Sequence, residues 1–219
     1  SDPYSANLNA SQGRLGPRYE VNATTGVFSF PYAQPALESS VDRRCQAADS
    51  DIDPARNSGA RWFAEGHYIT QDDAQAGNDD NNASWREMTF FPAGEGYNGV
   101  FVGPTVRGLP AIKAWPVVDP GAVVVDVDVP GDGRFHVGSS VRDNGDGTWR
   151  YAYAVHNMNS DRSAQAFSVP VPAGVTLSDV GFHDVDYHSG EPFDGTDWTF
   201  NQSGGFATWS TAPHSSAPN

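Results

Sequence analysis

The sequence predicts an all-β fold, an antiparallel β-sandwich of the immunoglobulin or jelly-roll kind. The clearest signal lies in residues 142–172, where a turn rich in Asp, Asn and Gly leads into a strand. These residues accept the positive φ angles that hairpin turns require. Apolar residues then recur with a period of two at Trp149, Tyr151, Tyr153 and Val155. This alternation predicts that one face of the strand, with Trp149, lies against a core.

Two further observations support an all-β fold. Short apolar runs alternate with turns rich in Gly, Pro and Asp, and no helical run is long enough for an α/β fold. The expected strands are residues 27–30, 61–70, 85–91, 100–102, 111–115, 122–129, 134–137, 148–155, 167–169, 175–187 and 206–210.

The chain divides into an arm and a domain. Residues 1–60 are rich in Pro, Gly, Asn and Ser, and their scattered apolar residues set no period, so they predict a long irregular N-terminal arm. The best strand of this arm ends at Pro31, which lacks the N–H that a ladder needs. Residues 61–219 form the predicted β-sandwich domain.

Two elements of the domain have specific local signals. Thr70 and Asp73 resemble a capping box, so a short helix is expected after the strand 61–70, ending before Gly77. In residues 122–129, Asp126 and Asp128 alternate with valines, which is typical of a half-buried strand.

Composition excludes several partners and cofactors. The 219 residues can bury a sizeable core, and 27 acidic against 13 basic residues give a formal net charge of -14. Such a surface repels phosphate backbones, which argues against nucleic acid as a partner. No apolar run approaches the roughly 20 residues that cross a bilayer, so no membrane insertion is expected. No nucleotide, haem or flavin is expected. Cys45 is the single cysteine, which excludes an internal disulfide.

The sharpest candidate for chemistry is the segment 182–188. If it is extended, Asp184, Asp186 and His188 share one face. Two carboxylates and an imidazole could bind a transition metal, and an open coordination position could activate water. Glu65 and His67 share a face of their own strand and could complete this site if the strands are adjacent. The alternative is that these side chains only hydrogen-bond to neighbouring turns.

Two acidic loops are candidate calcium sites. Asp49, Asp51 and Asp53 alternate as the first ligands of a calcium loop do. They depart from an EF-hand, because Pro54 stands where the glycine belongs and Ala60 where the bidentate glutamate belongs. The second loop is denser but has no recognised spacing, and it contains Asp79 and Asp80. The alternative for both is a solvated turn, and a bound calcium would have a structural role.

The aromatic residues predict a binding surface. Six Trp and eight Tyr provide flat rings of the kind that stack on sugars, although a β-sandwich core uses the same residues. Trp198 lies in a loop and is the best candidate for an exposed ring that binds a glycan.

Four segments carry a resemblance to a known family: SDPYSA at 1–6, GNDDNNAS at 77–84, NMNSDRS at 157–163 and GFHDVDYHSG at 181–190. Together they resemble a family of uncharacterised, larger secreted bacterial proteins. The resemblance implies export to the cell surface or the medium, and further sequence at both ends. It implies no activity.

The sequence therefore leaves three functions open. The leading expectation is an extracellular module that binds or assembles, with a glycan, a surface or itself as partner and with Ca²⁺ or another divalent cation in a structural role. The second is a metal-dependent hydrolase using the segment His183 to His188. The third is a subunit of an extracellular filament or coat, in which the arm supplies a strand to its neighbour.

Overall fold

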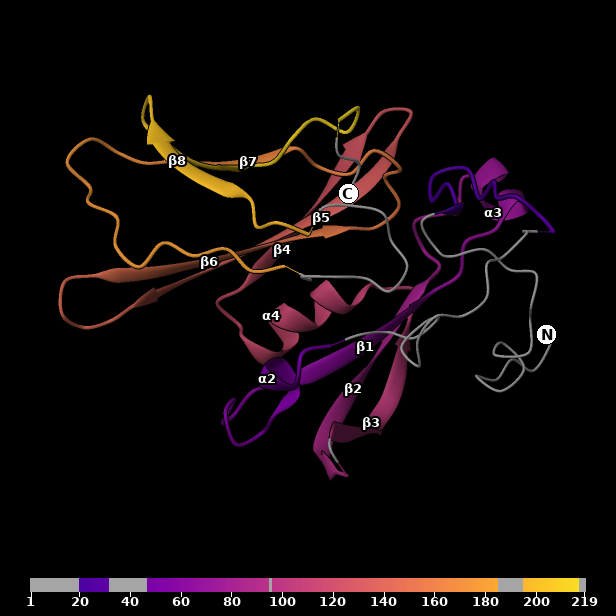
Figure 1. Ribbon diagram of the computed structural model, residues 1–219, viewed down its shortest axis with the longest axis horizontal. Coiled ribbons are helices and arrows are strands. Elements are labelled where there is room, and N and C mark those ends of the chain that lie inside the picture. The colour runs from indigo at the N-terminus through magenta and orange to yellow at the C-terminus, as the bar shows by residue number, and fades with distance from the viewer. Residues whose placement is uncertain (1–19, 32–46, 95, 185–194, 217–219) are drawn as a thin grey trace. The chain divides into compact units, whose positions relative to one another are not determined.

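The computed structural model describes residues 20–31, 47–94, 96–184 and 195–216. Within these residues the protein has three antiparallel sheets, each of three strands, and only short helices (Figure 1). The all-β prediction is therefore confirmed. Of the predicted arm, residues 20–31 and 47–60 are described and contain no strand. Cys45 lies outside the described residues.

Most of the predicted strands are present. The strands are β1 (Trp62–His67), β2 (Ala83–Ala93), β3 (Gly96–Arg107), β4 (Val123–Val129), β5 (Gly133–Asp143), β6 (Trp149–Asn157), β7 (Ala166–Pro170), β8 (Thr199–Ser203) and β9 (Phe206–Ser210). The helices are α2 (Asp49–Ile52), α3 (Gln71–Gln75), η2 (Ala111–Ala114) and α4 (Trp115–Val118). The sheet orders are β1-β2-β3, β4-β5-β6 and β7-β9-β8.

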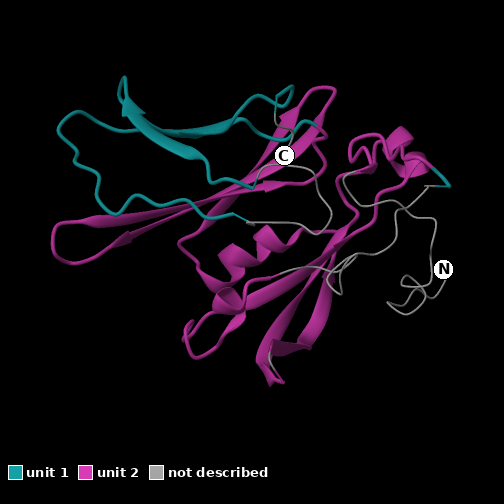
Figure 2. Cartoon of the chain, viewed as in Figure 1, with its two compact units in different colours: residues 1–19, 30–46, 162–219 teal, residues 20–29, 47–161 magenta. Residues whose placement is uncertain are grey.

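The chain divides into two compact units (Figure 2). Unit 2 consists of residues 20–29 and 47–161, and it contains β1 to β6 and the helices α2, α3, η2 and α4. Unit 1 consists of residues 1–19, 30–46 and 162–219, and it contains the sheet β7-β9-β8.

The predicted capping box opens α3. Thr70 is extended, and its side chain accepts a hydrogen bond from the backbone N–H of Asp73. Gly77 follows the helix with φ of 68°, a conformation that glycine adopts without strain. Local chemistry alone fixes this helix, which explains why it could be predicted.

The predicted strand at 111–115 is wrong, because these residues form η2 and the start of α4. Pro116 is in the first turn of α4, where a missing N–H costs nothing and a fixed φ favours the helix. Pro110 precedes η2. This helical segment contacts β1, β2 and β4, and thus lies between the two sheets of unit 2.

Gly138 of β5 allows the helical segment to approach its sheet. A Cβ added there would lie 2.8 Å from Cε3 of Trp115. We expect Gly138→Ala to lower the free energy of unfolding by about 1–3 kcal/mol, because the indole must move out of its packing. Gly66→Ala is the matched control, since a Cβ at that strand glycine meets nothing within 4 Å. Urea unfolding midpoints measure both, and equal effects would contradict the packing of Trp115.

Other local predictions also fail. Residues 27–30 and 175–184 form no strand, and β8 was not predicted. Trp149 is 55% exposed, so its predicted place in the core is wrong. The alternation along β6 is present, but the covered face is the opposite one. A period of two identifies two faces and does not say which of them is buried.

A buried polar turn follows β6. Met158, Asn159 and Ser160 are each at most 3% exposed. The side-chain oxygen of Asn159 accepts a hydrogen bond from the backbone N–H of Arg134 at 2.7 Å, and its amide nitrogen donates to the carboxylate of Asp79. The Ser160 hydroxyl donates to Asp132. These bonds hold β5, β6 and the loop before β2 together.

Candidate functional site

A row of ionisable side chains crosses the sheet β4-β5-β6 on its covered face. Asp126 of β4 is paired with His136 of β5, and His136 is paired with His156 of β6. Paired residues project to the same side of a sheet, so the three side chains are neighbours. The rings of His136 and His156 have centroids 5.8 Å apart.

His136 is the most buried member of the row. It is 2% exposed, and its Nδ1 lies 2.7 Å from Oδ1 of Asp126. Asp126 also forms an ion pair with Lys113 of η2. Burial lowers the pKa of His136, and the neighbouring carboxylate of Asp126 only partly opposes this.

Glu65 of β1 joins the row from the other sheet of unit 2. Its carboxylate lies 3.2 Å from Nε2 of His156 and accepts a hydrogen bond of 2.6 Å from the backbone N–H of Ala111. Burial by itself would raise the pKa of Glu65, but these two hydrogen bonds outweigh it and the pKa is lowered. Glu65 therefore connects β1, η2 and β6.

His67 completes the row two residues further along β1. Its ring hydrogen-bonds to the backbone carbonyl of Asp79. Burial lowers the pKa of His67, although Glu65 acts in the opposite direction. We call these five residues the imidazole row: Asp126, His136, His156, Glu65 and His67.

The imidazole row has unused bonding capacity. One ring nitrogen of each histidine contacts a carboxylate or a carbonyl. The other is buried and has no hydrogen-bond partner among the residues that the structure describes: Nε2 of His67, Nε2 of His136 and Nδ1 of His156. In the described part of the chain, no group of three or more His, Cys, Asp or Glu residues is arranged to hold a metal ion. Chemically, the row can take up protons.

Only part of the predicted transition-metal site can be located. Glu65 and His67 lie in unit 2 with His156 as a neighbour, whereas Asp184 belongs to unit 1. Asp186 and His188 lie outside the described residues. The sequence interpretation missed His136 and His156, although the turn between β5 and β6 sets the register that pairs them.

The first predicted calcium loop is partly helical. Asp49 and Asp51 lie in α2, and Asp53 follows its end. The carboxylate of Asp53 accepts a hydrogen bond from the backbone N–H of Ala55 at 2.8 Å and lies 3.4 Å from Arg56. The carboxylate of Asp53 is therefore bonded to neighbouring residues of its own loop.

The second predicted calcium loop is tied to the β5–β6 end of unit 2. Asp79 accepts hydrogen bonds from Asn159 and His67, and Asp80 forms an ion pair with Arg134. Both aspartates therefore have protein partners that hold this loop against the sheet.

Trp198 lies in a loop of unit 1, as predicted, but its ring is half-buried. It stacks on Phe182, with ring centroids 5.5 Å apart and planes inclined by 17°. One face of the indole is therefore covered by Phe182, which leaves less of the ring for a sugar.

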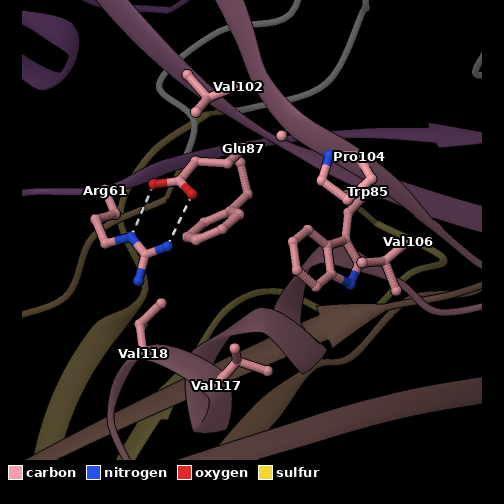
Figure 3. Close-up of a pocket in the computed structure, with 10 residues that line it drawn as sticks. Arg61, Trp85, Glu87, Val102, Pro104, Val106, Val117 and Val118 are labelled. Atoms are coloured by element: carbon pink, nitrogen blue, oxygen red, sulfur yellow. Dashed lines mark hydrogen bonds and ion pairs between the residues drawn. The ribbon is translucent and has the colours of Figure 1, made fainter.

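A small pocket lies elsewhere in unit 2, at the sheet β1-β2-β3 (Figure 3). Arg61 and Glu87 form a two-pronged ion pair at its edge, with both nitrogen–oxygen distances 2.8 Å. The hydrogen bonds from Arg61 lower the pKa of Glu87. Apart from this pair, the lining is aromatic, aliphatic or backbone: Phe63, Trp85, Val102, Gly103, Pro104, Val106, Val117 and Val118.

The pocket is too small for a typical ligand. Its volume is about 160 Å³, whereas sites for small molecules usually measure about 300–1,000 Å³. The ion pair neutralises the charges of Arg61 and Glu87 against each other. The pocket can therefore accept one side chain or a similarly small group.

Comparisons with protein-family models, with curated proteins and with solved structures find no match to this chain. In the described ranges, no helix is both long and apolar enough to span a membrane. Fold and chemistry define the chain as an all-β protein with an imidazole row whose central residue, His136, is buried.

Proposed function

We propose that the protein is an extracellular β-sandwich module that acts by assembly with a second copy of itself. The observation that carries this proposal is one face of the sheet β4-β5-β6, on which most of the large apolar side chains are exposed. The resemblance to secreted bacterial proteins supports the extracellular location, and a sheet with a broad apolar face supports a sandwich in which a further layer covers it.

This face is broad and apolar. Register places its residues on one side of the sheet, because Val125, Val137 and Val155 are paired across the three strands. We call it the outer face. Its large exposed side chains are each 36–58% exposed: Val123, Val125, Val127, Val141, Trp149, Tyr151, Tyr153 and Val155.

The outer face is large enough to form much of a protein–protein interface. Eight half-exposed valine and aromatic side chains present an apolar patch on the order of 500 Å² or more. The largest patch on a typical monomer is about 300–600 Å², and a standard interface buries roughly 800 Å² on each partner. Burying this patch would therefore supply most of one side of an ordinary dimer interface.

Charge favours a second copy as the occupant. The chain carries a net charge of -14, so two copies repel each other over most of their surface. Along β4, β5 and β6, the only charged residue on the outer face is Asp143, at the end of β5. Two copies can approach at this face with the least electrostatic cost.

The test compares association of three proteins by analytical ultracentrifugation over a wide concentration range. We expect the wild type to change from monomer to dimer, and Tyr151→Thr with Val125→Thr to weaken association at least tenfold. Val100→Thr is the control, because Val100 is similarly exposed on β3 of the other sheet. A wild type that stays monomeric would overturn the proposal, and binding to glycans lost in the double variant would assign the face to sugars instead.

A further inference from the structure

Residues 22–27 fold into a closed turn that belongs to unit 2. We call it the N-terminal turn. The side-chain oxygen of Asn22 accepts hydrogen bonds from the backbone N–H and the hydroxyl of Thr25, at 2.8 and 2.7 Å. The N–H of Gly26 donates to the carbonyl of Asn22, and the N–H of Asn22 donates to the carbonyl of Val27, both at 2.8 Å. Asparagine side chains that bond to a following N–H favour turns locally, so the shape of this turn is set by its own residues.

Thr24 attaches the N-terminal turn to two other loops of unit 2. Its hydroxyl contacts the backbone carbonyl of Asn159 at 2.7 Å and also the backbone carbonyl of Asp132. Asp132 lies in the turn between β4 and β5, and Asn159 lies in the polar turn after β6. A side chain without a donor at this position would lose these bonds, so the contact selects a hydroxyl.

Gly26 brings the N-terminal turn against the backbone at the start of α3. It is buried, and a Cβ added there would lie 2.5 Å from the backbone nitrogen of Gln71 and 2.5 Å from the carbonyl carbon of Thr70. Its φ of 70° is a second reason for glycine, because other residues adopt this conformation only with strain. Any side chain at this position would therefore push the turn away from unit 2.

The other positions of the N-terminal turn matter less for this contact. Thr25 is exposed, and the side chain of Val27 is 50% exposed. Together with the bonds made by Asn22, Thr24 and Gly26, this exposure defines a recognition pattern of Asn-x-Thr-x-Gly, in which x is any residue that fits the turn.

The surface that receives the N-terminal turn is held in place by bonds that do not involve the turn. The side chain of Asn159 bonds to the backbone N–H of Arg134 and to Asp79, and the hydroxyl of Ser160 bonds to Asp132. The backbone at the start of α3 is held by the first hydrogen bond of that helix. A surface that is already ordered loses little entropy when it binds a ligand.

We propose that this surface of unit 2 is a recognition site for peptide turns of the pattern Asn-x-Thr-x-Gly, and that it also binds such a turn when a separate molecule supplies it. We call it the turn site, and it consists of the backbone of Asp132, Asn159, Thr70 and Gln71. The same bonds form with either source, but the turn of the same chain competes at a high effective concentration. The turn site and the outer face consist of different residues, so either can bind without the other.

The test measures binding of a synthetic peptide, residues 20–31, by isothermal titration calorimetry. We expect saturable binding to the Gly26→Val chain, whose own turn cannot dock, and binding at least tenfold weaker to the wild type, whose own turn occupies the site. A peptide with Gly26→Ala should bind at least tenfold more weakly than the unchanged peptide, because its Cβ meets the backbone of α3. A peptide with Val27→Ala is the matched control and should bind like the unchanged one.

Two results would overturn the turn site. Equal affinity of the wild type and the Gly26→Val chain would place the peptide elsewhere on the protein, and an absence of binding to the Gly26→Val chain would show that the surface does not recognise a separate turn. The Thr24→Val chain gives a second check, because it lacks only the hydroxyl and should bind the peptide with intermediate affinity.

The Gly26→Val chain remains informative if it does not fold alone. Thermal unfolding followed by circular dichroism then replaces calorimetry. Excess unchanged peptide should restore a cooperative transition, and the Gly26→Ala peptide should not, because ligands that bind the folded state stabilise it. If neither peptide restores the transition, the turn site does not bind a turn from a separate molecule.

Discussion

Replacing Asn159 with alanine should lower the free energy of unfolding by about 3 kcal/mol. The side chain is fully buried and bonds in two directions, to the backbone N–H of Arg134 and to the carboxylate of Asp79. Alanine leaves both partners without their bond in a site with little access to water. An unsatisfied buried group costs about 1–3 kcal/mol, and more when it is charged.

Two further variants make this prediction specific. Asn144→Ala removes an asparagine from the exposed β5–β6 turn, where the amide donates only to Thr148, and should cost less than about 0.5 kcal/mol. Asn159→Asp keeps the shape but replaces the donor to Asp79 with a second carboxylate, so it should destabilise at least as much as alanine. Chemical unfolding at pH 7 measures all three, and an Asn159→Asp protein as stable as the wild type would refute the contact with Asp79.

Turns and caps could be predicted from sequence because their causes are local. The turn between β5 and β6 contains Gly145 and Gly147, both with positive φ, as hairpins require. The cap at Thr70 needs only the N–H of Asp73 three residues later. In each case the residues that determine the conformation are adjacent in the chain, so no knowledge of the tertiary structure was needed.

Tertiary contacts decided the features that the sequence did not predict. Residues 111–115 have a strand-like composition, but as a helical segment they place Trp115 against Gly138. The alternation along β6 was predicted correctly, but the prediction placed Trp149 on the wrong side. The covered face is the opposite one, and the groups that cover it are distant in sequence. Those groups include Lys113 and Glu65, which approach the face through Asp126 and His156.

The sequence predicted only part of the candidate site. Glu65 and His67 were selected as a pair on one face of a strand, and the structure places both in the imidazole row. His136 and His156 were missed, because each is a lone histidine in its own strand. They become neighbours only through the register of β5 and β6, which a careful alignment of the two strands on their turn would have shown.

The imidazole row should make the protein sensitive to acid. The pKa values of His67 and His136 lie below the usual 6.5, chiefly because burial disfavours the charged imidazole. Below pH 6.5 the unfolded chain therefore binds protons that the folded chain does not. Stability that is present above pH 6.5 is lost as the pH falls from 6.5 to the folded pKa values. The pKa of Glu65 lies below 4.5, so its contribution is present above pH 4.5 and is lost as the pH falls through its folded pKa.

His136→Gln tests the contribution of His136 to this effect, because glutamine can still bond to Asp126 but cannot be protonated. For the wild type we expect a melting temperature that falls by several degrees between pH 7 and pH 5, about 2–4 °C for each kcal/mol lost. The variant should show a clearly shallower slope, whatever its stability at pH 7, whereas His214→Gln, at an exposed position outside the row, should keep the wild-type slope. A positive charge on His136 would lie close to that of Lys113, because both side chains contact the carboxylate of Asp126. If the slopes of His136→Gln and the wild type are identical, His136 does not take up the proton that destabilises the fold.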